Sequence, residues 1–150
     1  MTIQRITTDQ VLLVTDLFNK YRIFYKQASD IALAEKFLTE RLTNNESVIF
    51  VALINGQPSG FTQLYPTYSS MRVSKNWILN DLYVEADQRK QGIGAALIKT
   101  AMNFAQNDGA SYLALSTAID NYTAQALYES IGFVRQEHDT AFFDYRIALK

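Results

Sequence analysis

The sequence contains no cysteine, two prolines, one histidine and almost no net charge. The absence of cysteine excludes disulfides, thiolate metal ligands and a covalent acyl-cysteine. With His138 as its one histidine, the chain cannot build a histidine-rich metal site or an acid–base pair of histidines. We expect His138 to be a solvated loop residue, because it stands in a polar stretch, and we expect no metal cofactor.

Charge and hydropathy exclude further classes of protein. The 14 Lys and Arg residues are balanced by 15 Asp and Glu residues, so the basic excess of a nucleic-acid-binding protein is missing. No apolar run approaches the roughly 20 residues of a membrane span, and the N-terminal residues do not form a secretory signal. We expect neither nucleic acid nor membrane as a partner, and a cytoplasmic location.

Length and periodicity predict a single α/β (α+β) domain over residues 1–150, because 48% hydrophobic residues suffice for one core. The Asn55-Gly56 pair is a strong hairpin signal between two apolar segments. The predicted order of elements is a strand at 2–5, helices near 11–21 and 30–42, strands at 47–54, 59–65 and 75–84, a helix from 92, a strand at 111–116, a helix at 121–130 and two strands within 133–149.

The segment from Leu82 to Leu97 carries the clearest functional signal, a strand, a short polar turn and a helix start that contains Gly92 and Gly94. Free amide groups at the positive end of a helix bind anions, and glycine lets a phosphate approach the backbone. This pattern predicts a phosphate-bearing ligand; a helix start that binds nothing is the alternative. A P-loop and a dinucleotide fingerprint are excluded, because no Gly-Lys-Ser/Thr follows and Leu97 occupies the third glycine position.

Two motifs resemble the GNAT family of acetyltransferases. Residues 89–94, Arg-Lys-Gln-Gly-Ile-Gly, resemble its Arg/Gln-x-x-Gly-x-Gly/Ala motif, and residues 121–133 resemble its Asn-x-x-Ala-x-x-x-Tyr-x-x-x-Gly-Phe segment. The order of elements is similar over essentially the whole chain. The resemblance implies a GNAT fold, with a mixed, mostly antiparallel sheet of six to seven strands and about four helices, and acetyl-CoA as the acetyl donor.

The resemblance also implies a set of cofactor-binding residues. In the family, the strand before the first motif pairs with the pantetheine arm, and the amides of the motif hold the pyrophosphate. Carried over, the pantetheine contacts are Leu82, Tyr83 and Val84; the pyrophosphate contacts are Arg89, Lys90, Gln91, Gly92, Ile93, Gly94 and Ala95; Asn121 and Ala124 approach the CoA arm.

Acetyl transfer to an amine requires a neutral amine, stabilisation of an oxyanion and a proton for the departing thiolate. With no cysteine, we expect direct attack in a ternary complex. Tyr128 is the expected general acid, and its alternative role is packing. For the base we expect Asp81 acting through water, with substrate orientation or solvation as alternatives. Asn80 stands where some relatives carry a carboxylate, which argues against a direct side-chain base.

The acceptor site is expected at the aromatic connection between the first two helices, where Tyr21, Phe24 and Tyr25 could hold an alkylammonium by cation–π contact or pack into the core. Similarity to the branch that holds diamine and small lysine acetyltransferases favours a primary amine. Nearby Lys20, together with other cations, would repel a polycation, so polyamine and protein lysine both stay open.

A catalytically silent module that binds acetyl-CoA as a sensor or scaffold is the alternative to an enzyme. An unrelated phosphate-binding α/β protein is a third reading. Residues 141–147 alternate apolar and polar side chains, which is consistent with a strand that pairs two copies into a homodimer.

Overall fold

The computed structural model describes residues 1–137 and 141–150, so His138 lies outside the described residues. The chain divides into two compact units, residues 1–116 and residues 117–150. The first contains a five-stranded sheet in the order β1-β2-β3-β4-β5. Its strands are β1 (Thr2–Arg5), β2 (Val48–Ile54), β3 (Gln57–Ser69), β4 (Ser74–Val84) and β5 (Leu113–Ala114). The first four pair antiparallel, and β5 lies parallel to β4.

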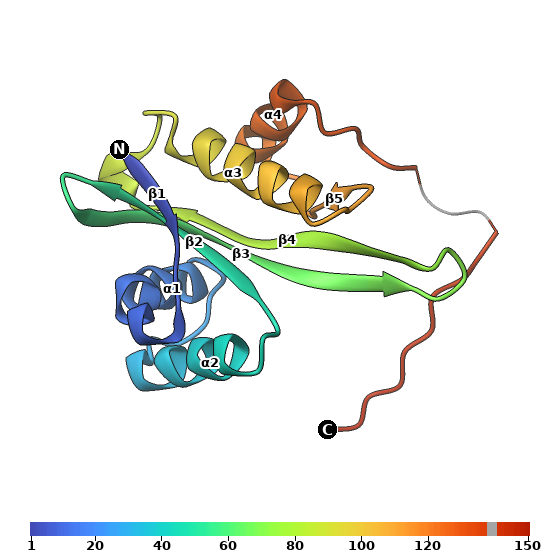
Figure 1. Ribbon diagram of the computed structural model, residues 1–150, viewed down its shortest axis with the longest axis horizontal. Coiled ribbons are helices and arrows are strands. Elements are labelled where there is room, and N and C mark those ends of the chain that lie inside the picture. The colour runs from blue at the N-terminus through green and yellow to red at the C-terminus, as the bar shows by residue number, and fades with distance from the viewer. Residues whose placement is uncertain (138–140) are drawn as a thin grey trace. The chain divides into compact units, whose positions relative to one another are not determined.

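Helices cover both faces of this sheet (Figure 1). A 3-10 turn, η1 (Thr8–Gln10), leads into α1 (Leu12–Phe24), and α2 (Ile31–Thr43) follows. On the opposite face, a second 3-10 turn, η2 (Ala86–Gln88), precedes α3 (Ile93–Asn107). The core between α1, α2 and the sheet is built from buried apolar side chains: Val14, Leu17, Phe18, Ala34, Leu38, Ile49, Val51 and Phe61. The buried stripe of α3 is Ile93, Leu97, Ile98, Ala101 and Ala105.

The hairpin of β2 and β3 is confirmed, because Asn55 and Gly56 both have positive φ, as the tight two-residue turn between these strands requires.

The next hairpin, of β3 and β4, is longer than the sequence predicts. Strand β3 then continues through Pro66, where a loop was expected. Proline is tolerated because β2 starts only opposite Leu64, so beyond that point β3 has an open edge and needs no amide donor there.

The second unit contains α4 (Tyr122–Ile131). The prediction of two strands within residues 133–149 is wrong for the described part of that segment, since residues 133–137 and 141–150 form no ladder. The sheet therefore has five strands rather than six to seven. Phe143 and Tyr145 are 89% and 92% exposed. The apolar alternation of this segment alone does not supply the partner strand that a ladder needs.

The first helix also extends beyond its predicted end. It runs to Phe24 with Tyr25 as its C-cap, so Tyr21 and Phe24 lie on α1 and not in a connection. Tyr21 stacks on Phe18 and meets Phe61 edge-on, at centroid distances of 6.1 and 6.0 Å. These contacts with the core stabilise the additional turn of helix.

Candidate active site

The loop between β4 and α3 exposes a row of backbone amides. Gly92 is the N-cap of α3, with φ of +82°, a left-handed conformation in which L side chains are strained. The first helical hydrogen bond runs from the Ala96 amide to the Gly92 carbonyl at 3.0 Å. The amides from Gly92 to Ala95 therefore have no partner within the helix. At the positive end of a 15-residue helix, this arrangement suits an anion.

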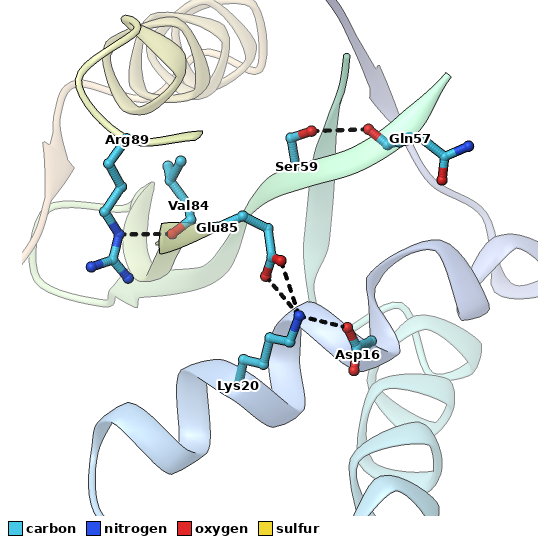
Figure 2. Close-up of polar contacts among 7 residues, drawn as sticks. All are labelled: Asp16, Lys20, Gln57, Ser59, Val84, Glu85 and Arg89. Atoms are coloured by element: carbon cyan, nitrogen blue, oxygen red, sulfur yellow. Dashed lines mark hydrogen bonds and ion pairs between the residues drawn. The ribbon is translucent and has the colours of Figure 1, made fainter. Parts of the chain in front are cut away.

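A Cβ at Gly92 would meet no protein atom within 4 Å, so the space beside this backbone is open. Arg89 closes one side of the loop, because its Nε donates to the Val84 carbonyl at 2.9 Å (Figure 2). Its guanidinium lies 5.5 Å from the centre of the Tyr83 ring. Lys90 adds an exposed cation at a residue with φ of +63°. The loop therefore places two cationic side chains next to backbone amides that no other protein atom covers.

An ion-pair cluster ties α1 to the start of this loop (Figure 2). Lys20 Nζ lies 2.9 Å from a Glu85 carboxylate oxygen and 3.1 Å from an Asp16 oxygen. These hydrogen bonds, Glu85 first, raise the pKa of Lys20 to about 12. The backbone amide of Glu85 donates to the Ser59 carbonyl at 2.9 Å, so the end of β4 is held from two sides. Lys20 is thus paired with two carboxylates.

The edge of β4 opens toward its C-terminal end. Strand β5 pairs with β4 only at Trp77 and Ile78. On the other side, the β3–β4 register shifts so that Gln63 faces Asp81 and Leu64 faces Leu79, which leaves Asn80 as an extra, bulged residue. Beyond Ile78, the main chain of β4 from 79 to 84 has an edge that β5 does not cover. Residues 82–84, predicted to contact pantetheine, lie on this edge.

Asp81 is buried beside this bulge, at 2% exposure, and is not a solvated carboxylate. Gln63 Nε2 donates to its Oδ2 at 2.6 Å, and Asn80 Nδ2 donates to its Oδ1 at 2.7 Å. The Tyr21 hydroxyl donates to the neighbouring Asn80 carbonyl at 3.4 Å. Burial raises the pKa of Asp81, and the hydrogen bonds from polar neighbours, Asn80 first, lower it by less. Asp81 is therefore a stronger base than an aspartate in water.

The three predicted acceptor residues differ in their surroundings. Tyr21 is half-buried against the core, and burial followed by the charge of Asp81 raises the pKa of its hydroxyl. Phe24 and Tyr25 are more than half exposed and pack edge-on, with ring centres 5.2 Å apart. Tyr21 and Tyr25 also pack edge-on at 5.0 Å. The structure thus brings Tyr21 together with Asp81 and leaves Phe24 and Tyr25 as a neighbouring aromatic surface.

The second motif forms the N-terminus and body of α4. The Asn121 side chain caps the helix by accepting the Ala124 amide at 3.2 Å. Tyr128 is half-buried, its ring lies 6.0 Å from that of Phe133, and its carbonyl accepts the Phe133 amide at 3.0 Å. Gly132 ends the helix with φ of +121°. Within this unit the motif residues therefore define a helix with both ends fixed.

Two residues near Asp81 were not predicted from the sequence: Gln63, which donates to its carboxylate, and Tyr65, whose hydroxyl pKa the charge of Asp81 raises. Gln63 is fully buried, and its Oε1 has no hydrogen-bond partner among the described residues. A polar residue within the apolar alternation of β3 is the signal that could have identified it.

No group of three or more His, Cys, Asp or Glu side chains in the described ranges is suited to a metal ion. None of the helices described is long and apolar enough to cross a membrane.

Taken together, the free amides of α3 and the uncovered edge of β4 give this α/β protein the arrangement that the sequence motifs predict for a phosphorylated ligand with an extended arm. The sequence model of the Acetyltransferase (GNAT) family matches residues 13–133. The chain therefore belongs to the GNAT acetyltransferase family, whose members use acetyl-CoA as cosubstrate, and it is an acetyl-CoA-dependent N-acetyltransferase of the GNAT type.

Several known proteins are similar over nearly the full length. An uncharacterized N-acetyltransferase, YhfO of Bacillus subtilis (strain 168), is 46% identical over 145 residues, 97% of this chain and 95% of the relative. The crystal structure of a probable acetyltransferase superposes with a TM-score of 0.88 at 39% identity, covering 100% and 99% of the two chains. An aminoglycoside N-acetyltransferase solved in complex with CoA shares the fold, with a TM-score of 0.79 at 19% identity over 97% and 95% of the chains. The predicted GNAT fold is confirmed.

Proposed function

We propose that this acetyltransferase transfers the acetyl group of acetyl-CoA to a primary amine of a small molecule or a lysine side chain, by direct attack in a ternary complex. The observation that carries this proposal is Asp81, a buried carboxyl at the bulge of β4, one residue before the edge predicted to bind pantetheine. A primary ammonium must lose a proton before it can attack, and a carboxylate with a raised pKa is suited to accept it.

The residues present fit acetyl-CoA. The amides of Gly92 to Ala95 have no helical partners, and the backbone at Gly92 is open, so this cradle accommodates the pyrophosphate, with Arg89, Lys90 and Gln91 around it. The uncovered edge of β4 at Leu82, Tyr83 and Val84 offers main-chain groups to the amides of the pantetheine arm. Asn121 and Ala124 are proposed as further contacts on the strength of their motif.

In the proposed mechanism, acetyl-CoA supplies the acetyl group. Asp81 accepts the proton of the acceptor ammonium, directly or through one water, and the neutral nitrogen then attacks the acetyl carbonyl carbon. A backbone amide of β4 donates a hydrogen bond to the carbonyl oxygen as its negative charge grows. The nitrogen–carbon bond forms as the carbon–sulfur bond breaks, and the hydroxyl of Tyr128 gives its proton to the departing sulfur. Tyrosine keeps this proton at neutral pH, because the usual pKa of its hydroxyl is about 10. The new amide nitrogen loses its extra proton to water, and Tyr128 regains a proton from water, so the products are the N-acetylated amine and free CoA thiol.

The proposal is tested by thiol release from acetyl-CoA in the presence of a panel of primary, secondary and aromatic amines. We expect release with primary amines and a matching amount of N-acetylated product by mass spectrometry. Initial-rate kinetics should show intersecting lines, as sequential binding of both substrates requires, and parallel lines would contradict direct attack. A protein that binds acetyl-CoA but releases no thiol with any amine would contradict the proposed reaction.

We also propose that the protein forms a homodimer through residues 141–147. Phe143, Tyr145 and Ile147 are each at least 80% exposed, which supports an apolar contact in an assembly. Light scattering on the purified protein should give the mass of two chains, and Tyr145→Lys should reduce it to one. The single-domain organisation and the cytoplasmic location stay predictions.

A further inference from the structure

Gln63 is a polar side chain in the most buried part of β3. It is fully buried, as are Phe61 and Leu64 on either side of it. Burial of an amide group costs free energy unless its hydrogen bonds are replaced within the protein, whereas an apolar residue of similar size would pack here without that cost. Gln63 is therefore expected to have a role other than filling the core.

The side chain of Gln63 contacts Asp81, which lies directly opposite it in the β3–β4 ladder. Gln63 Nε2 donates to Asp81 Oδ2 at 2.6 Å, a short distance that is typical of a hydrogen bond to an ionised carboxylate. Asn80 Nδ2 donates to the other oxygen, Oδ1, at 2.7 Å. Two donors on different oxygens fix the plane of the carboxyl group.

The two donors differ in their access to water. Asn80 is exposed, so water can take its place at Oδ1. Gln63 is fully buried, so Oδ2 would be left without a donor if the Gln63 amide were removed. A buried charge without a hydrogen-bond partner is costly, which makes Gln63 the donor on which the ionised form of Asp81 depends.

No cation holds the carboxylate of Asp81. Of the ion pairs in residues 1–137 and 141–150, none involves this residue. The titratable groups beside it are Tyr21 of α1 and Tyr65 of β3, and burial followed by the charge of Asp81 raises the pKa of both hydroxyls. Both tyrosines are therefore neutral at neutral pH.

The charged side chains on the elements packed against Asp81 have other partners or are exposed. They are Lys20 (paired with Asp16 and Glu85), Lys75 (paired with Asp108), Arg22 (bonded to the Ala28 carbonyl at 3.5 Å) and Lys99 (exposed). The ionisation of Asp81 thus depends on neutral amide donors rather than on a neighbouring charge.

A neutral amide suits a carboxyl group that must take up a proton in every reaction cycle. Lys or Arg in this place would lower the pKa of Asp81 through a full charge and make it a weaker base. Gln63 stabilises the carboxylate less, and its Oε1 has no hydrogen-bond partner among the described residues. When the amide turns over, this oxygen can accept a hydrogen bond from the O–H group of the protonated carboxyl. Gln63 can therefore pair with Asp81 before and after proton uptake.

We propose that Gln63 is a positioning residue for acetyl transfer, whose side-chain amide holds the carboxylate of Asp81 ionised and in one orientation until it accepts a proton from the acceptor amine. This inference rests on the proposed function, in which Asp81 is the base. The proton passes from the ammonium nitrogen to a carboxylate oxygen of Asp81, directly or through one water, and leaves to water after the product has dissociated. The side chain of Gln63 acts through Asp81 alone.

The pH dependence of kcat in the Gln63→Met variant tests the inference. Methionine has a similar length but no donor, so the ionised form of Asp81 loses one hydrogen bond and the carboxyl group stays protonated up to a higher pH. We expect the midpoint of the rise in kcat to move to higher pH, and kcat at a pH below both midpoints to fall about tenfold or more. The KM for acetyl-CoA should be unchanged.

Thr62→Val is the matched control. Thr62 is also a fully buried residue of β3, and its Oγ1 donates to the main-chain carbonyl of Asp81 at 2.8 Å. The variant therefore removes a buried hydrogen bond to the same residue and leaves its carboxylate untouched. Thr62→Val should keep the midpoint of the wild type, even where urea unfolding shows that it is less stable. A Gln63→Met variant with the same pH profile as Thr62→Val would overturn the inference.

A measurement on the wild type decides the question even if Gln63→Met does not fold. The side-chain amide resonances of Gln63 in 15N NMR spectra should titrate with the same midpoint as kcat, because this amide bonds the group that ionises. In Asp81→Asn the same resonances should not change with pH. Gln63 resonances that stay constant with pH in the wild type would overturn the inference.

The inference and the proposed function fail separately. If Asp81→Asn keeps the wild-type rate, the proposed base is wrong, and the role of Gln63 is overturned with it. If Asp81→Asn loses the rate while Gln63→Met keeps the wild-type rate and pH profile, the proposed function stands and the role of Gln63 alone is overturned.

Discussion

The Gly92→Ala variant isolates the proposed pyrophosphate cradle from the stability of the fold. Gly92 has φ of +82°, and a Cβ there would meet no protein atom within 4 Å. The substitution therefore adds no clash within the protein, and its cost is the strain of an L-residue in the left-handed region. That strain is about 1 kcal/mol, equivalent to a decrease of about 2–4 °C in melting temperature for a chain of this size.

The effect on the ligand should be larger than the effect on the fold. A methyl group at Gly92 would occupy the space that a pyrophosphate needs in order to reach the amides of Gly94 and Ala95. Loss of one or two charge-assisted hydrogen bonds predicts a weakening of CoA binding by about tenfold to a hundredfold. The dissociation constant of CoA is measured by calorimetry at fixed ionic strength, because charge contacts are screened by salt.

Gly109 provides a matched control at the other end of the same helix. It has φ of +85°, and a Cβ there also meets nothing within 4 Å. Gly109→Ala should therefore lower the melting temperature as much as Gly92→Ala does and leave CoA binding unchanged. Equal CoA affinities in the two variants would refute the assignment of the α3 amides as the pyrophosphate site.

Three further predictions concern other parts of the molecule. Tyr128→Phe should lower kcat by about 10²-fold with unchanged acetyl-CoA affinity. Tyr122→Phe, at an exposed residue of the same helix, should leave kcat unchanged. The rate of thiol release measures both, and equal kcat values in the two variants would contradict a role for the Tyr128 hydroxyl. Gly60→Ala should destabilise the fold by about 1–3 kcal/mol in urea unfolding, since its Cβ would lie 3.0 Å from the Tyr83 carbonyl oxygen; an unchanged midpoint would contradict the tight packing there. The pKa of Asp81 is raised in the folded protein, so the free energy of unfolding of the wild type, relative to Asp81→Asn, should fall as pH rises from about 4 through that pKa. Urea unfolding at a series of pH values measures this difference, and the opposite slope would contradict burial of the charge.

Local patterns were sufficient to predict the elements that depend on local chemistry. The Asn55-Gly56 turn requires positive φ at both residues, and these two residue types adopt it readily, so the hairpin could be predicted. The glycine at position 92 likewise indicated a helix start with an open backbone. The apolar stripe of α3 predicted its buried face, because helical periodicity is a property of the segment itself.

Features that depend on distant partners could not be predicted in this way. Pro66 lies in a strand because β2 starts only opposite Leu64, which leaves the edge of β3 open at Pro66, and no property of residues 59–74 reveals where β2 starts. Asp81 is buried because Gln63 of another strand and Tyr21 of α1 meet it, so its raised pKa follows from tertiary contacts alone. Residues 141–149 show the alternation of a strand, but a strand also needs a neighbour.

The pH dependence of kcat in the Asp81→Asn variant tests the central claim most directly, with Asp9→Asn as an exposed-residue control. If Asp81 accepts the proton of the amine, wild-type kcat for a primary amine should rise with pH through the raised pKa of Asp81. Asp81→Asn should lose most of the rate together with this rise, and Asp9→Asn should keep both. A variant Asp81→Asn that acetylates the amine at the wild-type rate, with the same pH profile, would contradict the account.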